Sequence, residues 1–532
     1  MTERPLGAQI SHYLKSRGVD VIFGIPGVHN QELYRGIEEA GITHILGRHE
    51  QGVGFMADGY ARASGKPGVA YVITGPGVCN IMTPMGQAYS DSVPMLVISS
   101  CLDETAFRRG QLHQMLDQEC AARTVCEWSE TAQSHTAAYG LLERSFEEFA
   151  AKRPRPKHIQ VPISVLEAKA PDFPPRRPLV ISAAKEDNAI SKVADMLKNA
   201  KRPLFVLGGG ACNADVTRLL ENCNAAVFTT FAGRGLVPPT YPYFWGSFLS
   251  RPETKAAVAV ADLVIVLGSE LAEVDLWRDH LGHTAPMVRV DIDTEVLSDA
   301  QNAEVRIAMR VEDFVPAILK KVSASSHASE WEVQDFMRDR SLWRAEADRV
   351  YSGIIPAIEA VQTAMPEEAL IYSDMTQFAY LAKEVWDMPL PGRWHHPFGF
   401  GTLGYALPAA IGGSVARPDL PVVAIAGDYG FQYTLPELGV AVELGLSLPI
   451  LIWDNKKLKA IKDSMVGAQI APNAVEALNP DFSALAEAYG AFAARPKTVK
   501  QLEGALSNAF KAGKPTLIHL LVEDLINNLS NS

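Results

Sequence analysis

The stretch 421–455, PVVAIAGDYGFQYTLPELGVAVELGLSLPILIWDN, constrains the fold more than any other part of the chain. Its apolar runs 422–426 and 449–453 have the length and composition of strands buried on both faces of a sheet. The residues between them have helical spacing, so the stretch predicts one βαβ unit. In a right-handed unit both strands end at the same edge of the sheet, and we expect Asp428 and Asn455 to converge there.

Asp428 and Asn455 are therefore a candidate metal site. A carboxylate and an amide oxygen are hard ligands that suit Mg²⁺, which keeps its other positions for phosphate oxygens and water. Gly427 and Gly430 flank the aspartate and allow the backbone to approach a phosphate, and the following helix offers its N-terminal amides. Taken alone, such a pair more often marks a helix cap and a turn, so the rest of the chain must decide.

The composition is that of an ordinary α/β enzyme. Of the 532 residues, 47% are hydrophobic and 21% are charged, and the formal net charge is −12. We expect no nucleic-acid partner, because phosphate contacts require clustered Lys and Arg. The six cysteines show no CxxC spacing, which argues against a zinc site or a disulfide framework. No targeting segment or membrane-spanning run is evident, so we expect a cytoplasmic protein without a membrane partner.

The alternation of strands and helices divides the chain into three parts. Residues 1–170, 188–325 and 350–532 each predict a doubly wound, mainly parallel sheet, so the expected fold class is α/β with three domains. The segment 171–187 is rich in proline and charge and is typical of a linker between domains. The polar stretch 322–330 separates the second part from the third.

Four motifs, in this order, resemble those of one enzyme family. They are FGIPG at 23–27, RHEQGVGFMADGYAR at 48–62, TGPG at 74–77, and GDYG at 427–430 with DN at 454–455. Together they resemble the thiamine-diphosphate-dependent 2-oxo acid enzymes of the acetolactate synthase and pyruvate decarboxylase superfamily. The resemblance covers nearly the whole chain. It implies a pyrimidine-binding, a central and a diphosphate-binding domain, with thiamine diphosphate and Mg²⁺ as cofactors.

The resemblance assigns roles to three residues around the reacting part of the cofactor. Glu50 matches the glutamate that hydrogen-bonds the aminopyrimidine ring and so activates the cofactor, which then serves as an electron sink for decarboxylation. Gly401 matches the residue whose carbonyl receives the pyrimidine amino group. Leu403 matches the bulky apolar residue that holds the cofactor bent, although by pattern alone it is a core leucine.

The metal ligands implied by the resemblance are Asp428, Asn455 and the backbone carbonyl of Lys457. The remaining residues expected to contact the cofactor are Pro26, Gly75, Asn80, Thr376, Gln377, Gly427, Tyr429 and Gly430. Tyr429 departs from the usual glycine and Asp454 from the usual asparagine. We expect binding to be retained, because the Tyr429 amide can still face the diphosphate and Asp454 only precedes the ligand. The lysines from 456 to 459 are expected to form a solvated face.

His29 and His113 lie on first-domain loops that should face the cofactor, and they are candidate catalytic residues although each alone is more often a surface histidine. The pair 395–396 lies in the third domain, unlike the His-His pair of related decarboxylases. The segments GIPGVHNQELYRG, RHEQGVGFMADGYARASGKPGV, LHQMLDQ and HHPFGFGTLGYALPAAIG resemble a branch that decarboxylates 5-guanidino-2-oxopentanoate to 4-guanidinobutanal and CO₂. A guanidinium tail requires a carboxylate in the pocket. The candidates are Asp117, Glu270, Glu273 and Asp275.

Two other functions remain open. One is an acetolactate synthase-like carboligase acting on pyruvate, in which FAD is possible but not predicted; the turn at 208–210 would suit a nucleotide phosphate and is equally a plain strand-to-helix turn. The other is an inactive homologue, which the intact Glu50, Asp428 and Asn455 oppose. For an active enzyme the resemblance implies a small-molecule 2-oxo acid substrate. It also implies a homodimer or homotetramer in which Glu50 of one subunit acts on cofactor held by its partner.

Overall fold

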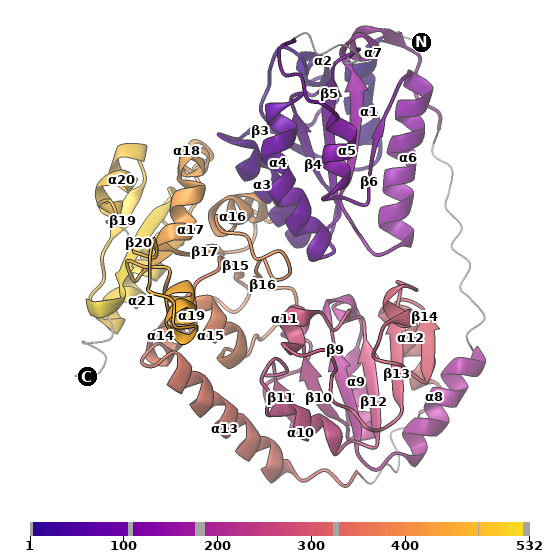
Figure 1. Ribbon diagram of the computed structural model, residues 1–532, viewed down its shortest axis with the longest axis vertical. Helices are drawn as coiled ribbons and strands as arrows, with labels where there is room; N and C mark the ends of the chain where they lie inside the picture. Colours follow the sequence, from indigo (N-terminus) through magenta and orange to yellow (C-terminus); the bar gives the residue numbers. More distant parts are fainter. Residues whose placement is uncertain (1–3, 105–109, 176–186, 323–328, 477, 525–532) are drawn as a thin grey trace.

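Buried apolar runs form the middle of three six-stranded sheets, each with helices on both faces (Figure 1). The computed structural model describes residues 4–104, 110–175, 187–322, 329–476 and 478–524. Within strand β5 (Met95–Cys101), the side chains of Val97 and Ile98 pack into two different cores, on opposite faces of the sheet. Burial of both faces is the reason that the strands appear in the sequence as continuous apolar runs. The predicted α/β fold class is confirmed.

The first-domain sheet is parallel, in the order β3-β2-β4-β5-β7-β6. Its other strands are β2 (Val21–Gly24), β3 (Thr43–Leu46), β4 (Gly68–Val72), β6 (Trp128–Thr131) and β7 (Lys157–Pro162), and a separate pair is β1 (Arg4–Pro5) with β8 (Lys169–Ala170). Its helices are α1 (Leu6–Ser16), α2 (Gln31–Arg35), α3 (Glu50–Ser64), α4 (Pro76–Ser90), α5 (Gln118–Arg123), α6 (His135–Ala151) and α7 (Ile163–Glu167).

The central sheet is also parallel, in the order β11-β10-β9-β12-β13-β14. Its strands are β9 (Pro203–Leu207), β10 (Ala226–Thr229), β11 (Phe244–Gly246), β12 (Leu263–Leu267), β13 (Met287–Asp291) and β14 (Val305–Ala308). Its helices are α8 (Asp187–Asn199), α9 (Val216–Cys223), α10 (Thr254–Ala259), α11 (Glu273–Leu276) and α12 (Val311–Leu319), with 3₁₀ turns η1 (Gly209–Ala211), η2 (Phe231–Gly233) and η3 (Val296–Ser298).

The third sheet is parallel, in the order β16-β15-β17-β18-β20-β19. Its strands are β15 (Leu370–Ser373), β16 (Trp394–His395), β17 (Val422–Gly427), β18 (Pro449–Asp454), β19 (Phe492–Ala494) and β20 (Thr516–Leu521). Its helices are α13 (Val333–Val350), α14 (Ile355–Ala364), α15 (Gln377–Val385), α16 (Ala406–Ala416), α17 (Asp428–Tyr433), α18 (Leu438–Glu443), α19 (Lys459–Gly467), α20 (Phe482–Tyr489) and α21 (Val499–Ala509), with the 3₁₀ turn η4 (Leu435–Glu437).

The predicted βαβ unit is present, but its helical part begins earlier than expected. The segment after β17 is not a free turn, because helix α17 begins at Asp428 itself and is followed by η4 and α18. Strand β17 pairs directly with β18, so their carboxyl ends lie at one edge of the sheet as predicted. Asp428 therefore lies in the first turn of a helix, where a negative charge is stabilised by the helix dipole.

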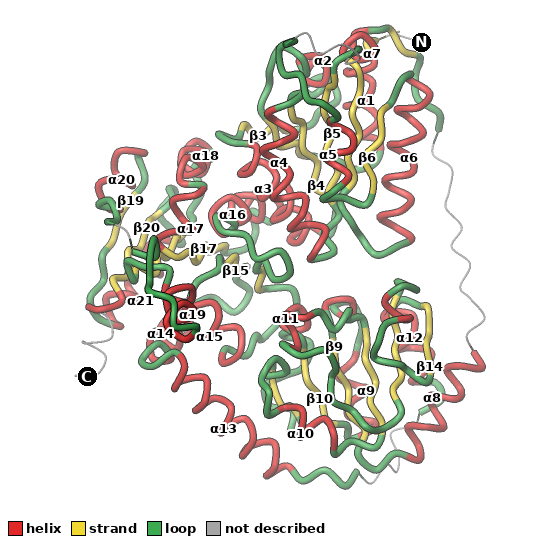
Figure 2. Tube along the Cα trace, in the orientation of Figure 1, coloured by secondary structure: helices red, strands yellow, loops and turns green. Residues whose placement is uncertain are grey.

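Helix α3 of the first domain packs directly on α16 of the third (Figure 2). A Cβ at Gly59 would lie 2.0 Å from the carbonyl oxygen of Ala409, and one at Gly412 would lie 1.9 Å from that of Met56. Both positions therefore require glycine for the two backbones to approach. Buried Tyr372 adds a hydrogen bond from its hydroxyl to the Gly59 carbonyl at 2.8 Å. One apolar core consequently continues from the first domain into the third.

Only some of the predicted domain boundaries fall on residues that the structure describes. Each sheet lies within one of the three predicted ranges, while helix α13 contacts strand β11 of the central sheet as well as α15 of the third. Residues 176–186 of the expected linker and residues 323–328 around the expected end of the central domain lie outside the described residues. In the described parts, no helix is long and apolar enough to span a bilayer.

Candidate active site

Two carboxylates meet at the carboxyl edge of the third sheet. Because Gly427 lies opposite Trp453, the following residues Asp428 and Asp454 are neighbours. Asn479, which precedes α20, donates through Nδ2 to Asp428 Oδ2 at 2.7 Å and to Asp454 Oδ1 at 2.9 Å. Both carboxylates are buried, and burial raises the pKa of Asp428 to about 6. No sequence signal indicated Asn479, which lies on a loop without a recognisable motif.

Asn455 lies at the same edge and contacts another predicted residue. Its Nδ2 donates to Oε1 of Gln377, the first residue of α15, at 2.9 Å, and its Oδ1 accepts the Lys457 amide at 3.1 Å. Thr376 is the N-cap residue of the same helix. One carboxylate with amide oxygens fits Mg²⁺, which commonly takes few protein ligands and completes its shell with phosphate and water. Among the described residues, no group of three or more His, Cys, Asp or Glu side chains is placed so that it could hold a metal ion by itself.

Asp374 supports the turn that carries Gly401 and Leu403, which resembles the segment that receives the pyrimidine. It follows strand β15, it is fully buried, and it accepts the amide of Gly404 at 2.8 Å. A Cβ at Gly430 would lie 2.4 Å from its Oδ2, so the carboxylate also fixes the approach of helix α17. Burial raises its pKa to about 6. Next to this support, Gly401 has a left-handed φ of +66° and Leu403 is half-buried rather than a full core residue.

The second edge belongs to the first-domain sheet and carries Glu50. This residue begins helix α3, is 8% exposed, and accepts a hydrogen bond from Asn80 Nδ2 at 2.9 Å. Asn80 therefore holds the predicted activating carboxylate, whereas the sequence indicated only a contact to the cofactor. Gly75 is the N-cap residue of helix α4, has a φ of +72° and donates its amide to Gln118 Oε1 at 2.8 Å. Pro26 is exposed on the neighbouring turn.

His29 and His113, which are far apart in the sequence, come together beside this edge. Their Nδ1 atoms are 3.3 Å apart and their rings meet edge to face with centroids 4.8 Å apart. His113 has a φ of +62°, and its carbonyl lies directly against Gly75. The pKa of His29 is lowered mainly by burial and to a smaller extent by the neighbouring His113. The two rings can therefore share one proton between their facing nitrogens.

Comparison with known proteins agrees with this geometry. Models of the thiamine pyrophosphate enzyme match at residues 4–121 (N-terminal binding domain), 190–318 (central domain) and 374–520 (C-terminal binding domain). The chain is 40% identical to a probable 2-ketoarginine decarboxylase of Pseudomonas aeruginosa over 523 residues, which are 97% of this chain and 93% of the relative.

The chain belongs to the thiamine pyrophosphate enzyme family. The resemblance found in the sequence is confirmed at this level. A more distant relative is the large subunit of acetolactate synthase isozyme 2 of Escherichia coli, which is 28% identical over 98% of this chain and 96% of the relative. Another is the mitochondrial catalytic subunit of acetolactate synthase of Saccharomyces cerevisiae, which is 28% identical over 97% of this chain and 80% of the relative.

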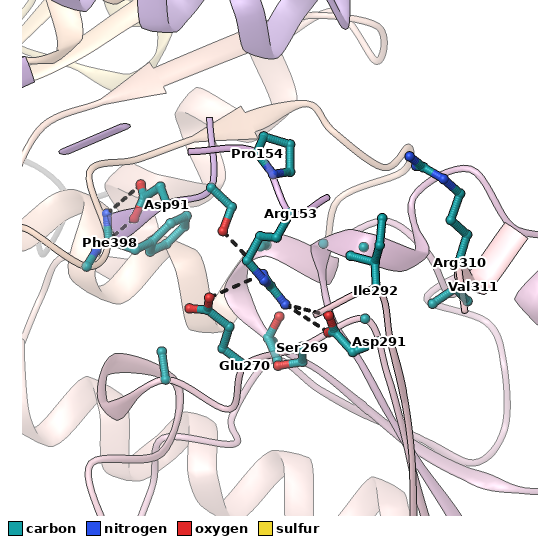
Figure 3. Close-up of a pocket in the computed structure, with 18 of the residues that line it drawn as sticks. Asp91, Arg153, Pro154, Ser269, Glu270, Asp291, Ile292, Arg310, Val311 and Phe398 are labelled. Carbon is teal, nitrogen blue, oxygen red and sulfur yellow. Dashed lines mark hydrogen bonds and ion pairs between the residues drawn. The ribbon is translucent and has the colours of Figure 1, made fainter. Parts of the chain in front are cut away.

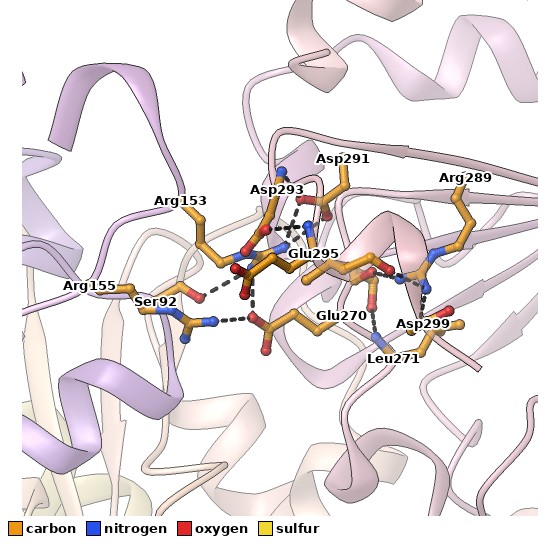
Figure 4. Close-up of polar contacts among 12 residues, drawn as sticks. Ser92, Arg153, Arg155, Glu270, Leu271, Arg289, Asp291, Asp293, Glu295 and Asp299 are labelled. Carbon is orange, nitrogen blue, oxygen red and sulfur yellow. Dashed lines mark hydrogen bonds and ion pairs between the residues drawn. The ribbon is translucent and has the colours of Figure 1, made fainter. Parts of the chain in front are cut away.

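Besides the two edges, this thiamine pyrophosphate enzyme has a cavity of about 430 Å³ between its first and central domains (Figure 3). Arg153 reaches into it and donates to both oxygens of Asp291, at 2.8 and 2.9 Å. Glu270 and Asp293 each lie 3.3 Å from the same guanidinium. Arg155 donates to the same oxygen of Glu270, Oε1, at 2.6 Å (Figure 4). Arginines of the first domain thus fill the space between carboxylates of the central one.

The residues of this cavity do not fit a flavin dinucleotide. Two amides of the glycine turn that could hold a pyrophosphate are already bonded, because Gly208 donates to the Leu267 carbonyl at 2.9 Å and Gly210 to that of Gly268 at 3.0 Å. A Cβ at Gly208 would lie 2.2 Å from the Gly268 carbonyl, so close approach of strands β9 and β12 explains the glycines.

The four candidate carboxylates for a guanidinium tail lie in different places. Glu270 and Asp275 line the central cavity, and Glu273 belongs to helix α11 beside it. Asp117 instead follows the His113 loop and caps helix α5, accepting the Cys120 amide at 2.9 Å. It lines a second cavity of about 390 Å³ at the carboxyl edge of the first sheet.

Proposed function

We propose that this chain is a thiamine-diphosphate- and Mg²⁺-dependent decarboxylase of a 2-oxo acid. The observation that carries the proposal is the placement of Glu50, with its Asn80 partner, at one sheet edge and of Asp428, Asn455 and Gln377 at another. The bound cofactor would supply the electron sink. The carboxylate of Glu50 would hydrogen-bond its pyrimidine ring, with the Gly401 carbonyl receiving the amino group and Leu403 packing beneath it.

The diphosphate and the metal would be held by the third-domain edge. Asp428 and Asn455, with the carbonyl of Lys457, would bind Mg²⁺. The amides at the start of helices α17 and α15 face the same edge, and helix N-termini favour anions. The residues proposed to contact the cofactor in addition are Thr376, Gln377, Gly427, Tyr429 and Gly430, with Pro26, Gly75 and Asn80 from the first domain. His29 and His113 would hold and move a proton at their facing Nδ1 atoms.

The proposed substrate is 5-guanidino-2-oxopentanoate, which would give 4-guanidinobutanal and CO₂ in arginine catabolism. The similarity to a probable 2-ketoarginine decarboxylase supports this choice. A guanidinium binds best to a carboxylate that faces it. Of the four candidates we propose Asp117, because it follows the loop that carries His113. Glu270 is occupied by arginines, and Asp275 already accepts the Phe231 amide at 3.3 Å.

We further propose a homodimer or homotetramer with sites between subunits. Exposed apolar side chains lie near both edges, including Leu112 and Leu116 in the first domain and Phe400 in the third, which are 63%, 76% and 51% exposed. Helix α19, which follows the DN motif, has no buried residue although it carries Ile461 and Val466. A second copy would cover these surfaces and shield the cofactor from water. A cytoplasmic location would suit the six free cysteines.

A carboligase that makes acetolactate from pyruvate is the second candidate, and the acetolactate synthase relatives over nearly the full chain favour it. One experiment separates the two. The purified enzyme with thiamine diphosphate and Mg²⁺ is given a panel of 2-oxo acids, and CO₂, aldehyde and acetolactate are all measured. Fastest release of 4-guanidinobutanal supports the proposal. Acetolactate from pyruvate as the fastest product would replace it with the carboligase, and no turnover of any acid would indicate an inactive homologue.

A further inference from the structure

The carboxylate of Glu437 lies directly against the chain that leads into Glu50. Its Oε1 accepts the backbone amide of His49 at 3.0 Å, and both oxygens lie 3.2 Å from the amide nitrogen of Arg48. His49 is the N-cap residue of α3, and Glu50 is the first residue of that helix. A glutamate within a helix often makes the same contact to its own N-cap amide, as one half of a capping box. Here the carboxylate comes from the third domain, at the end of η4.

The side chain of Glu437 is buried in close contact with the first turn of helix α3. The residue is 0% exposed, and a Cβ at Gly52 in the first turn of α3 would lie 2.2 Å from Oε1. Burial raises the pKa of Glu437 to about 7, while the two amides and the nearby Arg48 favour its charged form. Arg48 also pairs through its guanidinium with Glu443, on the exposed side of α18. The contact therefore fixes the N-terminus of α3 against the third domain of the same chain.

We propose that Glu437 is a positioning residue for Glu50, an inference that rests on the proposed function. The side chain of Glu50 is held by one hydrogen bond from Asn80, at 2.9 Å. The location of its backbone is set by the two preceding amides that Glu437 accepts. Catalysis by a carboxylate depends on its placement within a fraction of an ångström, so loss of this clamp should impair activation of the cofactor without impairing its binding.

The test compares Glu437→Gln with Glu443→Gln, in the full enzyme loaded with thiamine diphosphate and Mg²⁺. The control removes the same charge from a neighbouring helix and also loses a contact to Arg48, but its carboxylate is exposed. The readout is the exchange of the thiazolium C2 proton of the bound cofactor with deuterium, followed by NMR, together with cofactor affinity by calorimetry. We expect exchange about tenfold to hundredfold slower in Glu437→Gln, with unchanged affinity, and normal exchange in the control.

Exchange at the wild-type rate in folded Glu437→Gln would overturn the proposal, and so would equal slowing in Glu443→Gln. Glu50→Gln is measured beside them: normal exchange in that variant would refute the role of Glu50, and with it the proposed function, whatever Glu437 does. If Glu437→Gln does not fold, Glu437→Asp keeps the charge and withdraws the carboxylate from the amides. Gly52→Ala disturbs the same contact from the helix side. Slower exchange with retained affinity in these variants supports the proposal, and normal exchange overturns it.

Discussion

Asn479 places one amide nitrogen between two buried carboxylates, 2.7 Å from Asp428 Oδ2 and 2.9 Å from Asp454 Oδ1. Asp454 has a further partner, because His519 Nε2 lies 2.7 Å from its other oxygen. An amide at this position satisfies buried oxygens that a cation would also satisfy. The proposed Mg²⁺ at Asp428 would therefore either bind the other oxygen of that carboxylate or displace Asn479, which lies on the loop before α20.

Asp428→Ala should weaken binding of thiamine diphosphate and Mg²⁺ by about hundredfold or more, since loss of an outer partner of a metal ligand already costs about tenfold to hundredfold. Asn455→Ala should act in the same direction and less severely, because a neutral oxygen contributes less to a cation. Calorimetric titration of the purified variants measures both. Asp454→Asn is the control, and we expect a smaller effect from it. Unchanged affinity in Asp428→Ala would refute this placement of the metal.

Glu50→Gln should retain the shape of the side chain and lose the carboxylate that favours the reactive tautomer of the pyrimidine. Loss of a positioned acid–base group typically costs about 10² to 10⁴ in rate. Cofactor should still bind, because most of its proposed contacts come from the third domain. Steady-state turnover and calorimetry test the two parts separately. Turnover at the wild-type rate would mean that the motif around Glu50 does not have the assigned role.

Asp374 should make stability depend on pH. Burial raises the pKa of its carboxyl from 3.8 to about 6, so the folded protein favours the protonated form. The stabilisation is complete below about pH 4 and is lost as the pH rises through about 6. About two pKa units correspond to roughly 3 kcal/mol. Asp374→Asn keeps an acceptor for Gly404 and cannot ionise, so its melting temperature relative to wild type should increase over this interval. Parallel melting curves at all pH values would contradict the prediction.

The sequence predicted what is local and periodic. Continuous apolar runs such as 422–426 identified strands, because burial on both faces leaves no polar positions in them. Carboxylates at strand ends identified Asp428, and the same rule would have found Asp374, which follows β15 in the same way. Beginnings of elements were less accurate: α17 begins at Asp428, and its first turn contacts Asn479 and Asp374 from distant parts of the chain, which no local pattern records.

Residues that act across domains could not be predicted from the sequence. Glu437 lies in a segment with ordinary helical spacing, and its role depends on the packing of α3 against the third domain. The meeting of His29 with His113 likewise requires the sheet order, which brings two loops together. Asn479 has no motif at all. Such contacts join segments far apart in the chain, so only the three-dimensional arrangement specifies them.

Purified enzyme should carry no flavin, because Arg153 and its carboxylate partners project into the central cavity and two amides of its glycine turn are already bonded. The same cluster should matter for stability. Arg153→Ala leaves Asp291 buried without its partner, which typically costs about 3–5 kcal/mol. Adding Asp291→Asn should restore part of this loss, since the uncompensated charge is then removed. The absorbance spectrum of the purified protein tests for bound flavin, and the denaturant unfolding midpoint tests the stability of the variants. Stoichiometric flavin would contradict the first, and an unchanged unfolding midpoint the second.

Asp117→Asn should reduce kcat/KM for 5-guanidino-2-oxopentanoate and leave neutral 2-oxo acids unaffected. An asparagine still caps helix α5, so the fold is retained. It cannot pair with a guanidinium as a carboxylate does, and a buried charged group without its partner costs about 1–3 kcal/mol, or roughly tenfold to hundredfold in specificity.

The control variant is Glu273→Gln, which removes the same charge beside the central cavity and should leave kcat/KM unchanged for both substrates. Kinetics with the guanidino acid and with a neutral acid of similar length measure the difference. An equal loss on both acids would show that Asp117 supports the loop rather than the substrate, and an effect of Glu273→Gln on the guanidino acid alone would move the cationic subsite to the central domain.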